Sequence, residues 1–119
     1  MALNLTKVLF APSLIVAISS SIAKADMASG DEIRNLISGN TLQGAGVSGI
    51  YSEYYDPNGT LRGDGYSGKW KIEGDKGCMD YGSGFQCWSG LINNNASIWY
   101  LNGKPTAVGF MSSGNPNRY

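Results

Sequence analysis

The chain has 119 residues, with nine basic and nine acidic side chains and no histidine. The lack of histidine excludes His-based catalytic triads and the commonest zinc sites. The sequence contains no long basic run, which argues against nucleic acid and anionic membranes as partners.

The N-terminal segment has the three parts of a secretory signal peptide. Lys7 is the positive start, Val8–Ala23 is apolar, and Ala23-Lys24-Ala25 is a cleavage pattern. A membrane anchor would need roughly 20 apolar residues, and this run is shorter and is interrupted by Pro12 and three serines. Cleavage leaves one domain over 26–119, with seven basic and nine acidic residues. We therefore expect a periplasmic or secreted monomer with no membrane span after cleavage.

One amphipathic helix is predicted near the start of the mature chain, over residues 29–39. Ser29 followed by Glu32 forms a capping box. Apolar side chains at positions 33, 36 and 37 make one stripe, and Gly39 can adopt the left-handed conformation that ends a helix. We expect the stripe to cover the mouth or a face of a sheet.

The rest of the mature chain is predicted to form short strands separated by turns. Alternating or aromatic-rich segments predict strands at 41–44, 50–55, 60–62, 69–73, 88–92, 96–101 and 106–111. Gly44–Gly46 is interpreted as a flexible break, and Trp70 and Ile72 are expected to point inward. Asn102-Gly103 is a strong hairpin dipeptide, although we expect Lys104-Pro105 to lengthen that loop.

These elements define the expected fold class. We expect an all-β protein, a small antiparallel up-and-down meander or barrel of lipocalin-like form, with one short N-terminal helix over one end. No helix separates the strands, so parallel crossovers are excluded. The 17 glycines suit tight corners and strong bending.

The two cysteines are predicted to form a disulfide across a hairpin. A two-residue turn at Gly82-Ser83 would place Cys78 opposite Cys87, on a non-hydrogen-bonded pair with Cα atoms about 4.5 Å apart. That distance is at the short end of the range a disulfide spans. The pairing leaves no thiol nucleophile, and we expect no catalytic residue, no metal and no cofactor.

Carboxylates and aromatic rings are the remaining candidates for function. The carboxylates that could pair as acid and base are Glu53, Asp56, Asp64, Glu73, Asp75 and Asp80. Most lie in or beside turns, where Asp stabilises the backbone. Aromatic rings occupy both faces of the 51–55 strand and fall out of phase with their neighbours at 88 and 99. Some must therefore line a cavity or a contact patch, and the ligand-binding candidates are Tyr54, Tyr55, Trp70, Trp88 and Trp99.

Several segments together resemble a known family. They are Tyr54–Thr60, Gly68–Trp70, Gly77-Cys78, Cys87-Trp88 and Gly114–Pro116. Their order is similar to that of a family of small uncharacterised exported proteins of alphaproteobacteria, with a Pro-x-Gly-Thr turn, a Gly-x-Trp strand, two cysteines and a C-terminal Gly-Asn-Pro. The resemblance covers residues 31–117. It implies periplasmic export and a β fold, and it transfers no catalytic residues.

Three functions are compatible with these features. The leading hypothesis is a non-enzymatic barrel that binds a small ligand or a protein partner. The second is an inhibitor of a foreign hydrolase, such as lysozyme or a protease, with a rigid loop over Asp80–Phe85 entering the enzyme's cleft. The third is a glycoside hydrolase that uses two carboxylates, which the positions of the acidic residues do not favour.

Overall fold

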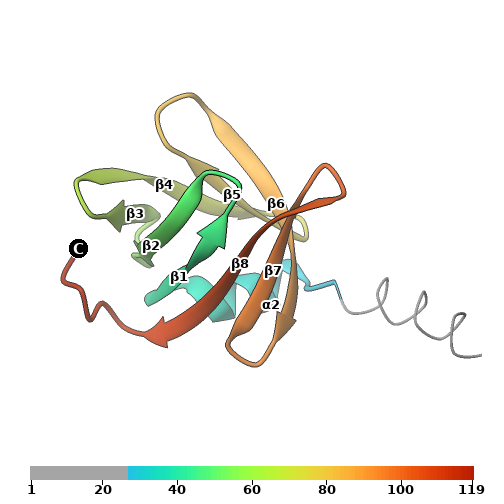
Figure 1. The fold of residues 1–119 in the computed structure, drawn as a ribbon, viewed down its shortest axis with the longest axis horizontal. Helices are drawn as coiled ribbons and strands as arrows, with labels where there is room; N and C mark the ends of the chain where they lie inside the picture. The colour runs from blue at the N-terminus through green and yellow to red at the C-terminus, as the bar shows by residue number, and fades with distance from the viewer. Residues whose placement is uncertain (1–26) are drawn as a thin grey trace, which may run out of the picture.

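The fold is a closed eight-stranded antiparallel barrel with one short helix (Figure 1). This computed structural model describes residues 27–119, so the predicted signal peptide lies outside the described residues. Each strand pairs with its neighbours in sequence, and β8 pairs with β1 to close the barrel. The elements are α2 Gly30–Ile37, β1 Asn40–Gly46, β2 Gly49–Tyr55, β3 Thr60–Gly63, β4 Tyr66–Glu73, β5 Lys76–Asp80, β6 Phe85–Asn93, β7 Ala96–Leu101 and β8 Lys104–Ser113. The predicted all-β, lipocalin-like architecture is confirmed.

Helix α2 fills one end of the barrel. Its capping box is formed, because Ser29 Oγ accepts a hydrogen bond from the Glu32 amide and Glu32 Oε1 accepts one from the Ser29 amide. The apolar stripe is buried, with Ile33 and Ile37 fully enclosed. In Figure 1, α2 lies at the lower end of the barrel, beside the start of β1. No helix within residues 27–119 is long and apolar enough to cross a membrane.

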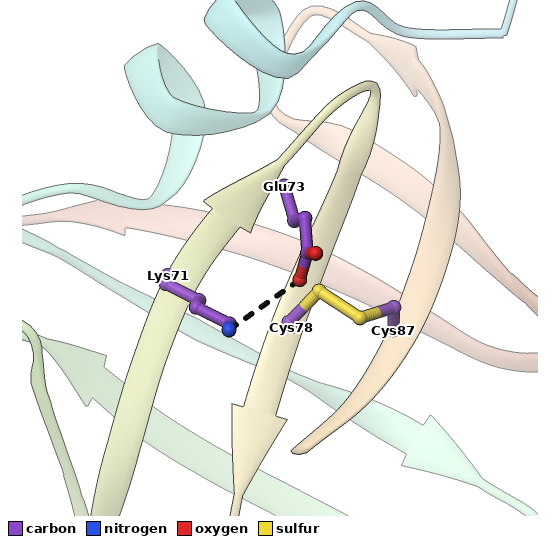
Figure 2. Close-up of a disulfide and its surroundings, with 4 residues drawn as sticks. All are labelled: Lys71, Glu73, Cys78 and Cys87. Carbon is purple, nitrogen blue, oxygen red and sulfur yellow. Dashed lines mark ion pairs between the residues drawn. A yellow bond between two sulfur atoms is a disulfide. The ribbon is translucent and has the colours of Figure 1, made fainter.

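The cysteine hairpin forms in the predicted register. Cys78 pairs with Cys87, Met79 with Gln86 and Asp80 with Phe85. The two cysteines are bonded, with Cα atoms 4.0 Å apart, and Figure 2 shows the bond joining β5 to β6. The hairpin is therefore covalently fixed close to its tip.

Two local predictions were wrong. Gly44 and Gly46 belong to β1 and pair on both sides, because the missing side chain lets β8 approach closely: a Cβ on Gly44 would lie 2.0 Å from the Val108 carbonyl oxygen. The β7–β8 loop is also not lengthened, since Lys104 pairs with Leu101 across a two-residue turn. The irregularity lies instead within the strand pair, where the register shifts between residues 99 and 100.

Candidate functional site

A cavity of about 490 Å³ opens at the barrel end opposite α2. It reaches the surface at the β1–β2 turn, where Val47 and Ile50 are exposed. The wall consists mainly of apolar and aromatic side chains from every strand except β3, and it includes Leu42, Tyr51, Glu53, Tyr55, Tyr66, Met79, Tyr81, Gln86, Trp88, Trp99, Leu101 and Ala107. This volume is within the range of about 300–1,000 Å³ that is typical of small-molecule sites.

Strand β2 supplies the polar part of the wall. Its side chains alternate, so that Tyr51, Glu53 and Tyr55 face the interior. Strand β8, on the other side of β1, provides room for Tyr51: a Cβ on Gly109 would lie 2.6 Å from the Tyr51 hydroxyl oxygen. The Tyr51 hydroxyl donates to the Val108 carbonyl at 2.8 Å, which fixes that ring across the sheet.

Glu53 is buried, with 5% of its surface exposed, and accepts hydrogen bonds from three tyrosine hydroxyls. The Tyr55 hydroxyl is 2.6 Å from Oε2, and the Tyr66 hydroxyl is 2.8 Å from Oε1. The Tyr81 hydroxyl lies between the two oxygens, at 2.9 and 3.0 Å. A carboxylate only accepts hydrogen bonds, so three converging donors suit its charged form. We refer to these four residues as the Glu53–tyrosine cluster.

Each tyrosine of the cluster is held by a different element. Tyr55 is buried in β2 and packs edge-on against Trp70. Tyr66 folds over Gly63 on the neighbouring strand, where a Cβ would lie 2.2 Å from its ring. Tyr81 sits in the tip of the β5–β6 hairpin, where Asp80 Oδ1 accepts from the backbone amides of residues 82 and 84. The cluster therefore brings together β2, the start of β4 and the β5–β6 turn.

The electrostatic environment keeps these phenols protonated. Burial and the negative charge of Glu53 raise the pKa values of Tyr55, Tyr66 and Tyr81 well above the usual value near 10. The same two causes, burial first, raise the pKa of Tyr51 to about 12. The phenols therefore stay protonated and can donate, and Glu53 is the one acidic or basic residue in the described lining of the cavity.

The structure brings three of the five predicted ligand-binding residues into the cavity wall. Tyr55, Trp88 and Trp99 line it. Tyr54 does not line it and stacks against the Arg62 guanidinium, 5.2 Å from the ring centre. Trp70 is buried nearer the helix, where its indole Nε1 donates to the Asp56 carbonyl at 2.7 Å.

Sequence reasoning missed the tyrosines at 66 and 81 and did not single out Glu53 from the other carboxylates. The strand alternation already placed position 53 on the same face as Tyr51 and Tyr55, and this was the available signal. Tyr66 and Tyr81 lie beside turns and carried no comparable pattern. Only the closed barrel shows that they meet Glu53.

The remaining candidate carboxylates have structural partners or lie outside the cavity wall. Asp56 pairs with Arg62 at 3.2 Å, and Asp75 accepts from the Gly30 amide at the start of α2. Glu73 pairs with Lys71 at 3.4 Å beside the disulfide, as Figure 2 shows. The Glu73 carboxylate and the two sulfurs lie close together, but bonded sulfurs offer no thiolate to a metal.

The fold and the site together define the class: an up-and-down barrel with a polar cluster in a mostly apolar internal cavity. Comparison of the chain with protein-family models, curated proteins and solved structures found no match. The functional argument therefore depends on the cavity itself.

Proposed function

We propose that this chain is an exported, non-enzymatic barrel that binds a small, mostly apolar ligand in its cavity. The observation that carries the proposal is the cavity of about 490 Å³, which lies in a barrel that α2 closes at one end and that is open at the other. Met79, Trp88 and Trp99 supply its apolar surface, and the Glu53–tyrosine cluster supplies a few fixed polar groups. Small-molecule sites combine these two features.

The contents of the described wall favour binding over hydrolysis. Glycoside cleavage by two carboxylates needs an acid and a second carboxylate on either side of the bond. Glu53 is the single carboxylate among the described lining residues, and its oxygens are engaged by tyrosine hydroxyls. The glycoside hydrolase hypothesis is therefore less well supported.

Export is proposed from the signal-peptide pattern together with the disulfide between Cys78 and Cys87. Disulfides form and persist mainly in oxidising compartments such as the periplasm or the extracellular space. Cell fractionation tests this part: we expect a shortened, disulfide-bonded protein outside the cytoplasm. Full-length reduced protein inside the cytoplasm would contradict it.

Tryptophan fluorescence tests ligand binding, because two of the three tryptophans line the cavity. We expect octanol, used as a neutral apolar probe, to shift the emission of a Trp70→Phe variant, which retains Trp88 and Trp99. A variant with both Trp88→Phe and Trp99→Phe retains only Trp70 and should show little shift. Equal emission shifts in the two variants would overturn the proposal. It would also be overturned if octanol, lipids and cell-wall fragments all failed to bind saturably.

A second candidate is the hydrolase inhibitor, favoured by the form of the β5–β6 hairpin. The hairpin projects at the top of the view in Figure 1, the disulfide joins its strands close to the tip, and Phe85 near the tip is exposed. Rigid exposed loops of this kind suit insertion into an enzyme cleft. Assays against a panel of lysozymes and proteases test it, and absence of inhibition across the panel would remove it.

A further inference from the structure

The Glu53 side chain carries a buried negative charge that lacks a positive partner in residues 27–119. The ion pairs formed there join Arg62 to Asp56 and Lys71 to Glu73. Burial of a charge is unfavourable unless it is paired or hydrogen-bonded. The three tyrosine hydroxyls provide hydrogen bonds, but they leave the net charge of the cavity at minus one.

The hydrogen bonds also determine what the cluster can offer a ligand. A phenol hydroxyl has one proton to donate and two lone pairs that accept. Tyr55, Tyr66 and Tyr81 each direct that proton to Glu53. Their oxygens therefore present only lone pairs to a further group, so a ligand that binds here has to be a hydrogen-bond donor.

The aromatic rings at the mouth add a second attraction for positive charge. Tyr66 is 41% exposed and Tyr81 is 51% exposed, and their ring centres are 6.2 Å apart. Tyrosine rings attract a cation placed near their faces. The other polar side chains lining the cavity, Ser48, Gln86 and Thr106, are neutral, so an anionic ligand would meet Glu53 with no compensating cation in the described wall.

From these contacts we propose that the cavity selects organic cations: ligands with an ammonium group bound at the Glu53–tyrosine cluster and an apolar body against Trp88 and Trp99. This inference rests on the proposed ligand-binding function and specifies its ligand class. The ammonium group donates to the phenol oxygens and neutralises Glu53. A carboxylate of the same size is disfavoured by repulsion from Glu53, and the three cluster hydroxyls, which already donate to Glu53, have no proton left to donate to it.

Three probes with eight carbons each and different polar groups separate the contribution of charge to binding from the contribution of apolar contact. Octylamine, octanol and octanoate are titrated into the full mature protein at pH 7 by calorimetry. We expect octylamine to bind at least about tenfold more tightly than octanol, as one charge-assisted contact provides, and octanoate to bind most weakly. Octanoate or octanol binding as tightly as octylamine would overturn the inference.

A variant pair then assigns the preference to one carboxylate. Glu53→Gln keeps the side-chain shape without the charge, so octylamine and octanol should bind it within about twofold of each other, because the charge-assisted part is lost. The matched control is Glu73→Gln, an exposed carboxylate outside the cavity wall, which should keep the full preference. An unchanged preference in Glu53→Gln would contradict the inference.

The outcomes distinguish this inference from the function on which it rests. If none of the three probes binds, ligand binding in the cavity fails and the cation preference fails with it. If octanol and octanoate bind but octylamine has no advantage, the ligand-binding function stands and the cation preference alone is wrong. The comparison of probes on the unmodified protein needs no variant, so it decides the matter even if Glu53→Gln does not fold.

Discussion

Removal of one hydroxyl from the Glu53–tyrosine cluster should lower the free energy of unfolding by an amount that depends on whether water can replace that hydroxyl. Tyr55 is 2% exposed, and its hydroxyl lies 2.6 Å from Glu53. A hydrogen bond to a charged group contributes about 1.5–3 kcal/mol, and Tyr55 is far less open to water than Tyr66 and Tyr81. We therefore expect Tyr55→Phe to lower the free energy of unfolding by about 1.5–3 kcal/mol.

Tyrosine-to-phenylalanine changes at the two other positions should lower the free energy of unfolding by less. Tyr66 and Tyr81 are exposed at the cavity mouth, so water can replace either hydroxyl, and we expect losses below about 1 kcal/mol. Tyr54→Phe is the matched control, because this ring lies outside the cavity wall and keeps its stacking on Arg62. It should stay within about 0.5 kcal/mol of the wild type.

Urea unfolding at pH 7 measures all four variants. With a slope of about 1–2 kcal/mol per molar, which is usual for small domains, Tyr55→Phe should lower the midpoint by about 1 M or more at an unchanged slope. In a Glu53→Gln background the same change should cost less, because the charge-assisted bond is already lost. A Tyr55→Phe midpoint no lower than that of Tyr54→Phe would refute the reasoning.

Three further predictions concern stability. The disulfide closes a loop between positions nine apart in sequence. Its reduction should lower the free energy of unfolding by about 2.7 kcal/mol and the melting temperature by about 10–20 °C. An unchanged melting temperature in calorimetry would contradict the presence of the bond. Gly63→Ala places a Cβ 2.2 Å from the Tyr66 ring, so urea unfolding should show a free energy of unfolding lower by about 1–3 kcal/mol. The loss should be small in a Tyr66→Ala background, where the ring is absent. Equal losses in the two backgrounds would exclude the packing explanation. The pKa values of Tyr51, Tyr55, Tyr66 and Tyr81 are raised in the folded state, to about 12 for Tyr51, so the folded protein retains protons that the unfolded chain releases. Its stability should be constant between about pH 7 and 9 and fall as the pH rises through 10 towards 12, and a constant urea midpoint from pH 9 to 11 would contradict these shifts.

Local patterns were sufficient to predict the elements of the fold. The capping box at Ser29 and Glu32 marked the helix, and the spacing of Cys78 and Cys87 about a two-residue turn fixed their register. Both depend on residues close together in sequence, where local hydrogen bonds of the backbone and of capping side chains restrict the geometry. The glycines of β1 were misinterpreted because their role, close approach of β8, depends on a strand more than 60 residues away.

The candidate site was only partly predictable for the same reason. Tyr55 was identified because aromatic rings occupy both faces of its strand, and Trp88 and Trp99 because they are out of phase with their neighbours. The structure places all three in the wall. Glu53 resembled five other carboxylates in the sequence. Its distinguishing property is the convergence of tyrosines from β2, β4 and the β5–β6 turn, which exists only once the barrel closes.

The central claim, that a ligand occupies the interior of the barrel, is tested most directly by NMR of the protein titrated with octylamine. We predict saturable shifts at the Met79 methyl and at the indole signals of Trp88 and Trp99, which line the cavity, with the Trp70 indole unchanged. Shifts confined to the exposed outer residues Val108 and Phe110, or no saturable shift at any concentration, would contradict the claim.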